Sequence, residues 1–338
     1  MTTSDDLLPG ARTAVAQCLA ITRSDRVYII TDDATLSIGE ALRTATAEQG
    51  ATCRLMRLEE LGSRPFLRLP DTLVADMRAF APTASFFAAQ GQPGEIGFRI
   101  PLGPFLRSEL RVRHGHMIGI TPQLMRTGMR VDYQHVADLT RRVNTLVERC
   151  RTIRVQNDEG TEVTATFDPD RLRWVPCHGL YHQQGDWGNL PEGETYTSPA
   201  SLEGTLTARL IGDYFSEKYG LLDAPVVFRV QQSQVVSVDH PDQAMAREIW
   251  DYLNASPNGR RAGEFAIGTN DLLTELTGNL LQDEKFPGLH VAFGNPYPDR
   301  TGADWTSETH VDVIPLRTSI WVDGSRIMDR GRFTLPPA

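Results

Sequence analysis

Imidazole and carboxylate residues stand at the start of, or inside, short apolar runs near the C-terminal end of the chain. Glu264 precedes Phe-Ala-Ile, His290 precedes Val-Ala-Phe, and residues 310–314 are His-Val-Asp-Val-Ile. Successive side chains of a β-strand point to opposite faces, so His310 and Asp312 share one face and the two valines share the other. Polar groups beside buried neighbours need a partner. The pattern therefore predicts strands whose polar face binds something, and a metal ion is the occupant that we expect.

Each of these residues taken alone also fits an ordinary structural role. His310 and Asp312 fit a buried hydrogen bond at least equally well, because two such residues separated by one position are common. Glu264 alone fits a solvated carboxylate, and Tyr297, which follows a proline, fits simple packing. Glu194 lies in the loop Asn-Leu-Pro-Glu-Gly-Glu, which can turn sharply at its glycine. The combination of these residues carries the prediction.

Composition excludes several classes of protein. With 338 residues, 40% hydrophobic and 23% charged, the chain has a globular profile. No apolar run approaches the roughly 20 residues of a membrane helix, and the polar N-terminus does not resemble a signal peptide. The net charge of −9 argues against a nucleic-acid partner. Four scattered cysteines without a CxxC pair argue against a thiolate metal site. We therefore expect a cytoplasmic protein without nucleic-acid or membrane partners.

The first half of the chain alternates candidate strands and helices. A β-rich run at 26–30 is followed by a helical pattern at 34–49 and a further strand at 51–55. Additional strands are predicted at 84–89 and 117–120. This alternation predicts an α/β domain with a parallel sheet. The first strand is not followed by a GxGxxG motif, which argues against a dinucleotide site.

The remainder of the chain is predicted to be richer in strands. An amphipathic helix at 133–150 leads into a hairpin of strands 151–155 and 162–167. Helices are predicted at 242–253 and 271–284, and Asp323-Gly324 predicts a hairpin turn. The expected fold class is thus α/β, with an N-terminal α/β domain at 1–170 and a strand-rich, mixed α+β, metal-binding catalytic domain at 171–338.

The polar motifs of the second half together resemble a known family. In order, the chain has the segments Asn189–Glu194 (NLPEGE), Gly263–Asn270 (GEFAIGTN), Leu276–Lys285 (LTGNLLQDEK), His290–Gly294 (HVAFG) and His310–Asp312 (HVD). These resemble the successive motifs of the M29 metallo-aminopeptidases, the thermophilic aminopeptidase S/T type. The resemblance covers most of the second half and is weaker in the first.

The resemblance implies a pair of divalent ions, Zn, Co or Mn, held by six side chains: Glu194, Glu264, His290, Tyr297, His310 and Asp312. It implies water-mediated hydrolysis of an amide in a small peptide or peptide-like metabolite, with Tyr297 and Glu264 also expected to be catalytic. Tyr297 fits either a metal ligand or a donor to the developing oxyanion. The resemblance further implies a homodimer. Asp283 and Glu284 are candidate acid/base residues, although exposed charges at a helix end explain them more simply.

A second chemistry occurs among proteins similar to this family. The 2,5-dihydroxypyridine dioxygenases resemble these aminopeptidases but use one non-haem iron, which needs two histidines and one carboxylate. His310 and Asp312 fit two of these positions. The other histidine of that family aligns with Glu264 here, and His290 is the available substitute. Because Glu194 and His290 are present, the pattern favours the hydrolase.

Two other histidine pairs are not expected to bind a metal ion. His114 and His116 share one strand face, where packing explains them better than a metal site. His178 and His182 have the spacing of a helical ligand pair, but Gly179 disfavours a helix there.

Overall fold

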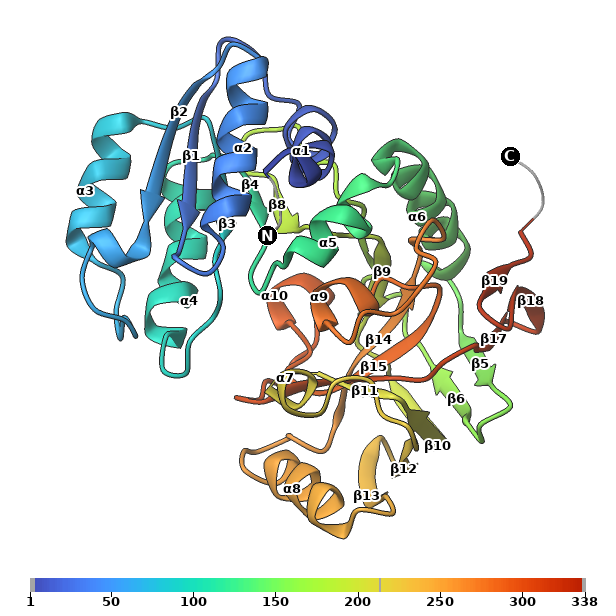
Figure 1. The fold of residues 1–338 in the computed structure, drawn as a ribbon. Coiled ribbons are helices and arrows are strands. Elements are labelled where there is room, and N and C mark those ends of the chain that lie inside the picture. The colour runs from blue at the N-terminus through green and yellow to red at the C-terminus, as the bar shows by residue number, and fades with distance from the viewer. Residues whose placement is uncertain (1–3, 213, 336–338) are drawn as a thin grey trace. The chain divides into compact units, whose positions relative to one another are not determined.

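The computed structural model describes residues 4–212 and 214–335 (Figure 1). The chain divides into two compact units: residues 1–137 with 179–192 form an N-terminal unit, and residues 138–178 with 193–338 form a C-terminal unit. The domain boundary expected near residue 170 lies inside the first segment of the C-terminal unit, and it stays a prediction. In the described part of the chain, no helix is long and apolar enough to span a membrane.

The N-terminal unit contains a parallel five-stranded sheet with the strand order β2-β1-β3-β4-β8. Its strands are β1 (Arg26–Thr31), β2 (Thr52–Arg57), β3 (Ala84–Ala88), β4 (Arg113–His116) and β8 (Trp187–Asn189). Its helices are α1 (Ser4–Arg12), α2 (Leu36–Glu48), α3 (Asp71–Phe80), α4 (Ile96–Pro104) and α5 (Pro122–Arg126). Helix α6 (Tyr133–Val147) continues from this unit into the next.

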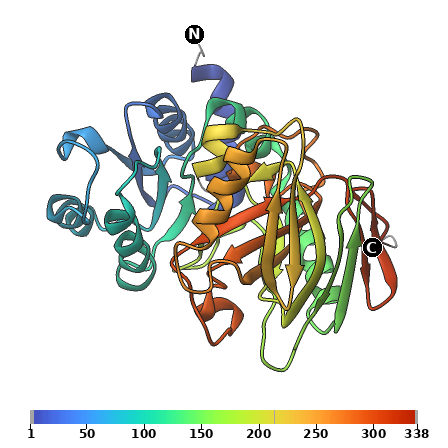
Figure 2. The same ribbon diagram turned by 90° about the horizontal axis from the view of Figure 1, so that it is seen from below.

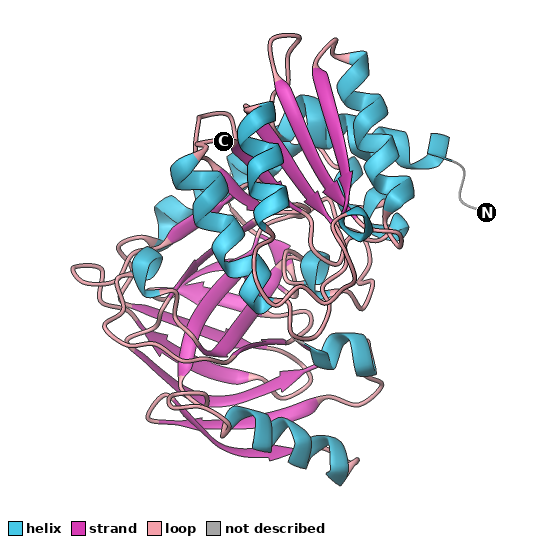
Figure 3. Cartoon of the chain, turned by 90° about the vertical axis from the view of Figure 1, so that its left-hand side faces the viewer, coloured by secondary structure: helices cyan, strands magenta, loops and turns pink. Residues whose placement is uncertain are grey.

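Both faces of this sheet are covered, which explains the unbroken apolar run of β1. Tyr28 and Ile30 pack with side chains of α3 and α4 in one core cluster, while Val27 and Ile29, on the opposite face, are also fully buried. Helix α2 contacts both β1 and β2, and Figure 3 shows helices flanking these parallel strands. Strands buried on both faces are typical of parallel sheets.

A buried ion-pair network fills the carboxyl edge of this sheet. Arg64 donates to Asp32, which directly follows β1, at 2.7 Å and to both oxygens of Glu95 at 2.8 and 2.6 Å. It also donates to the carbonyl of Gln90, beyond the end of β3, at 2.6 Å. The side chains of Arg64, Asp32 and Glu95 are only 4%, 2% and 0% exposed. The edge at which open α/β sheets commonly bind ligands is therefore occupied by side chains of the protein itself.

The C-terminal unit consists mainly of antiparallel strands, and Figure 2 shows helix α8 (Gln243–Leu253), in orange, beside them. One sheet has the order β13-β12-β10-β6-β5-β17-β18-β19 and a second has the order β11-β16-β15-β14-β9-β7. The strands of the first sheet are β5 (Thr152–Gln156), β6 (Glu162–Thr166), β10 (Ser201–Ala208), β12 (Val226–Gln231), β13 (Gln234–Asp239), β17 (Ser319–Val322), β18 (Ser325–Asp329) and β19 (Arg332–Phe333).

The second sheet carries most of the polar motifs. Its strands are β7 (Val175–Cys177), β9 (Glu194–Thr197), β11 (Leu210–Ile211), β14 (Ala262–Gly268), β15 (Gly288–Gly294) and β16 (His310–Ile314). The short helices of the unit are α7 (Tyr214–Tyr219), α9 (Leu280–Asp283) and α10 (Pro298–Thr301).

The core of this unit draws on both sheets. Phe265, Val291 and Val313 of the second sheet join one cluster with Val155 and Phe228 of the first. Alternation along β14, β15 and β16 therefore turns their even-numbered residues to the opposite face of the second sheet. The alternation along these strands is therefore enough to determine which face of the second sheet holds the polar residues.

The predicted fold class is confirmed, and most predicted elements occur with small shifts of their ends. Two predictions are wrong. Residues 117–120 are not a strand, because the chain turns there with Gly119 at φ +70°. The helix expected at 271–284 is reduced to the single turn α9, because Gly278 has φ +78° and the Asp283 carboxylate accepts hydrogen bonds from the amides of Thr277 and Gly278.

Candidate metal centre

The six residues expected to bind metal converge around the second sheet of the C-terminal unit. Glu194 begins β9, Glu264 lies in β14, His290 lies in β15, and His310 and Asp312 lie in β16. These five share the face opposite the apolar core, as the alternation predicts. The sixth residue, Tyr297, directly precedes α10.

Small residues alternate with the polar residues across this face. Ala266 pairs with His290, and Ala292 lies between Glu264 and Asp312 in the strand register. The larger polar side chains are therefore diagonal neighbours with alanines beside them. This arrangement gives them room to converge on one point without colliding.

The first cluster combines two carboxylates with one imidazole. The His290 Nε2 atom lies 3.3 Å from Glu194 Oε2 and 3.3 Å from Glu264 Oε1. All three residues are at most 6% exposed. Their ligand atoms lie within 4.8 Å of one another, which is close enough for one ion to contact all three.

His310 joins this cluster from the neighbouring strand. Its Nε2 lies 3.8 Å from Glu264 Oε2 and 3.7 Å from Asp312 Oδ2. Its Nδ1 lies 2.9 Å from the carbonyl oxygen of Asn295, and because a carbonyl only accepts, Nδ1 carries the hydrogen. A hydrogen on Nδ1 leaves Nε2 of the neutral imidazole with a free lone pair, as a metal ligand requires.

Tyr297 lies at the exposed side of the group. Its ring centroid is 4.8 Å from that of His310 and 6.0 Å from that of Tyr196, and the residue is 42% exposed. Its backbone has φ +51°, an uncommon conformation for a non-glycine residue. Such positions cluster at functional sites, and this one directs the tyrosine ring toward His310.

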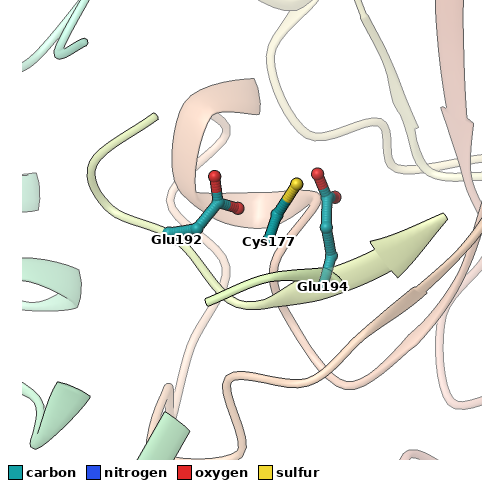
Figure 4. Close-up of side chains that lie close together, drawn as sticks. All are labelled: Cys177, Glu192 and Glu194. Carbon is teal, nitrogen blue, oxygen red and sulfur yellow. The ribbon is translucent and has the colours of Figure 1, made fainter. Parts of the chain in front are cut away.

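Cys177 lies beside Glu194, because strands β7 and β9 pair the two residues in register (Figure 4). The figure also shows Glu192, which precedes Glu194 by two positions in the chain. We did not single out Cys177 from the sequence, because it has no metal-binding spacing to another cysteine.

The sequence analysis also missed the importance of a charged segment. Glu284 lies with His290 and Asp312 in a second group whose ligand atoms are within 4.8 Å of one another. Lys285 and Asp283 are each 1% exposed. The expectation that Asp283 and Glu284 are exposed charges at a helix end is therefore wrong. The available signal was the triplet Asp-Glu-Lys shortly before the apolar strand β15, an unusual position for three consecutive charges.

The electrostatics of the site show a shortage of positive charge. Burial opposes a charge on His290, but the neighbouring carboxylates of Glu264 and Glu194 outweigh burial and raise the pKa of His290 to about 9. Burial, reinforced by the charges of Glu194 and Asp312, raises the pKa of Glu284 to about 8 despite the opposing effect of Lys285. Burial, with Glu264 nearby, also raises the pKa of Asp312. The raised pKa values of His290, Glu284 and Asp312 thus favour bound protons where a cation would otherwise balance the negative charge.

The residues present fit a divalent metal. Among the described residues, Glu194 Oε2 and His290 Nε2 are buried atoms with no hydrogen-bond partner, and they lie 3.3 Å apart. Leaving two such atoms unsatisfied is costly unless an ion satisfies both. Carboxylate oxygens and neutral imidazole nitrogens are also the donors that Zn, Co and Mn prefer.

The family model of the thermophilic metalloproteases (M29) matches residues 133–322. No curated protein sequence matches the chain.

Two solved structures show the same fold. The 2,5-dihydroxypyridine dioxygenase from Pseudomonas putida KT2440 is similar with a TM-score of 0.72 and 14% identity, covering 99% of each chain. The wild-type AmpT from Thermus thermophilus is similar with a TM-score of 0.69 and 16% identity, covering 98% of this chain and 99% of that one. At these identities the likeness concerns the fold. Since the family model spans more than half of the sequence, the chain belongs to the M29 family of metalloproteases and is a metal-dependent, aminopeptidase-like hydrolase.

Proposed function

We propose that this enzyme hydrolyses an amide bond at the N-terminal end of a small peptide or peptide-like metabolite, using two divalent ions held by the six converging residues. Two buried atoms without hydrogen-bond partners support this proposal most directly. They are Glu194 Oε2 and His290 Nε2, which lie 3.3 Å apart among further carboxylates. The proposed ligands are Glu194, Glu264, His290, Tyr297, His310 and Asp312. We add Glu284, which approaches His290 and Asp312.

The grouping of the carboxylates supports two ions rather than one. Four buried or nearly buried carboxylates, Glu194, Glu264, Glu284 and Asp312, surround two imidazoles, and Lys285 supplies one fixed positive charge. The candidate ligands form two groups, Glu194 with Glu264 and Glu284 with Asp312, and His290 belongs to both. Two divalent ions would give each group its own cation, which buried carboxylates need.

The chain's own residues would bind and orient the substrate. When bound, the ions would lower the pKa of a water molecule, so that it can attack near neutral pH, and would polarise the scissile carbonyl as Lewis acids. The neutral Nε2 of His310 is held in place through its Nδ1 hydrogen bond to Asn295. Glu264 reaches both imidazoles with its two oxygens and so fixes the spacing of the two histidines. Tyr297, which is partly exposed, would either bind a metal ion or, as a neutral phenol, donate a hydrogen bond to the substrate oxygen as negative charge develops.

Removing the metal tests this proposal. Dialysis against a chelator is expected to lower the hydrolysis of aminoacyl anilides and dipeptides by about 10³-fold, because both the activated water and the Lewis acid are lost. Adding Zn, Co or Mn to the metal-free protein should restore activity at close to two ions per chain by elemental analysis. Activity that survives complete metal removal would contradict the proposal.

The same preparation tests the iron alternative. A mononuclear dioxygenase would use His290, His310 and Asp312 as its two-histidine, one-carboxylate set. It would contain one Fe per chain and consume oxygen with a dihydroxypyridine substrate. Glu194 and Glu264 have no place in such a set, and their approach to the same His290 nitrogen favours hydrolysis.

We also propose that the protein is a cytoplasmic homodimer. Three large apolar side chains of the N-terminal unit, Leu67, Ile96 and Ile100, are 73%, 60% and 68% exposed. Leu67 lies close to Gly94 and Gly97 around the start of α4, and Ile96 and Ile100 are one turn apart on α4, so the three side chains belong to one region. Light scattering after gel filtration should give twice the chain mass of 37.6 kDa, and Ile100→Glu should shift it toward the monomer. A wild-type monomer at micromolar concentration would contradict the dimer.

A further inference from the structure

Lys285 is a buried cation at the centre of the candidate metal site. It is 1% exposed, and lysine is almost never buried without partners. Its Nζ lies 2.8 Å from Glu194 Oε1 and 2.7 Å from Glu284 Oε1. These two carboxylates belong to different groups of candidate ligands, so one ammonium links both.

The contact with Lys285 determines which oxygen of Glu194 faces the imidazole. Lys285 takes Oε1, and Oε2 is left as the buried atom without a hydrogen-bond partner, 3.3 Å from His290 Nε2. A carboxylate held in this way presents one defined oxygen to an ion. Without the ammonium, Glu194 could rotate or use both oxygens.

The backbone around Lys285 is held firmly. Its amide donates to Gln282 and its carbonyl accepts from Asn270. A Cβ on Gly268 would lie 2.0 Å from the Phe286 carbonyl oxygen, so only glycine permits this close approach. Gly268 is also the register partner of Glu194. At Gly268, strand β14 therefore lies beside both Glu194 and the segment that contains Lys285.

Lysine is an exceptional choice in this sequence. Lys218 and Lys285 are its only lysines, and all other basic residues, among 34 Lys and Arg in total, are arginines. Lysine provides a compact point charge, whereas arginine is larger and planar. Lys218 is 48% exposed and pairs with Glu248 on the surface, whereas Lys285 is enclosed.

We propose that Lys285 is a positioning residue of the metal centre, which orients Glu194 so that a single carboxylate oxygen faces the ion. The inference rests on the proposed function and deepens it. Outer partners of metal ligands commonly contribute 10- to 100-fold in affinity, which sets the expected size of the effect at roughly that range.

The test compares Lys285→Met with Lys218→Met as the matched control. The metal-free proteins are titrated with Zn²⁺ or Co²⁺ against a chelator of known affinity, and circular dichroism confirms that each is folded. Lys285→Met should raise the metal Kd about 10- to 100-fold and change the visible spectrum of bound Co²⁺, while Lys218→Met leaves both unchanged.

A double-mutant cycle tests whether Lys285 acts through Glu194. If Lys285 works by orienting Glu194, Lys285→Met should have little further effect on metal Kd in a Glu194→Ala background. Three results would overturn the inference: an unchanged Kd in Lys285→Met, a tighter Kd from the loss of positive charge alone, or equal effects in both backgrounds. Failure of the proposed function would look different, because the wild-type protein would then bind no metal or hydrolyse no amide.

Discussion

Glu264→Gln is expected to lower amide hydrolysis by about 10³-fold or more while leaving the protein folded. Glutamine has nearly the same shape as glutamate, but its neutral amide is a weak metal ligand. Glu264 is the side chain that approaches both His290 and His310, at 3.3 and 3.8 Å. Its loss therefore removes the charge that both imidazoles share. A rate lower by about 10³-fold corresponds to the loss of several kcal/mol of the transition-state stabilisation that the metal provides.

The control for this variant is Glu162→Gln on strand β6, whose side chain is 76% exposed. It removes the same charge and should change neither kcat/KM nor metal content by more than a factor of about two, since isolated surface charges contribute little. Steady-state hydrolysis and elemental analysis should be measured on both variants. If Glu264→Gln retained most of its activity and its metal, Glu264 would not be a ligand.

Arg64→Met is expected to destabilise the N-terminal unit by about 3–5 kcal/mol, because it leaves two buried carboxylates without their cation. Arg64 makes four close contacts, to Asp32, to both oxygens of Glu95 and to the Gln90 carbonyl. The control, Arg68→Met, removes an arginine that is 84% exposed and pairs with Asp71 only at 4.0 Å. It should cost less than about 1 kcal/mol. Urea unfolding and hydrogen exchange of the β1 and β3 amides measure the difference.

The pH dependence of this effect follows from the same network. Burial alone would raise the pKa values of Asp32 and Glu95, but hydrogen bonds from Arg64 and from neighbouring groups outweigh burial and lower both. In the wild type, this stabilisation is complete above the ordinary carboxyl pKa near 4 and is lost as the pH falls through the lowered values. In Arg64→Met, the carboxylates of Asp32 and Glu95 lack their cation. Their burial then destabilises the folded state most at neutral pH, where both are ionised. The stability difference should therefore shrink from pH 7 toward pH 4, and a difference independent of pH would contradict this account.

The alternation of side chains along the strands made part of the site predictable from the sequence. His310 and Asp312 share a face because strand geometry has a period of two, and this needs no knowledge of distant contacts. The approach of Glu264 to His290 depends on the pairing of β14 with β15, which the sequence order only suggests. The resemblance to the family supplied that long-range information.

The segment before β15 shows what local patterns could not reveal. Asn270 and the following residues favour a helix, yet the structure has one turn, because Asp283 binds the amides of Thr277 and Gly278 instead of facing solvent. The same loop buries Lys285 against Glu194. Side-chain to backbone hydrogen bonds of this kind compete with helix formation and leave little trace in hydrophobic periodicity.

The short strand β8 illustrates a second limit. It has only three residues, Trp187–Asn189, and it pairs with β4, which lies about 70 positions earlier. No local preference distinguishes such a strand from a loop. Residues 179–192 belong to the N-terminal unit, and their strand β8 pairs with β4 of that unit. The division of the sequence between the two units therefore depends on tertiary contacts.

Anomalous diffraction from crystals soaked in Zn²⁺ or Mn²⁺ tests the central claim most directly. The account predicts two strong peaks, each about 2.0–2.3 Å from its ligand atoms, with Glu194 Oε2, Glu264 and His290 Nε2 at one and Asp312 at the other. Peaks that lie elsewhere, or a site that stays free of metal while these side chains turn apart, would contradict it.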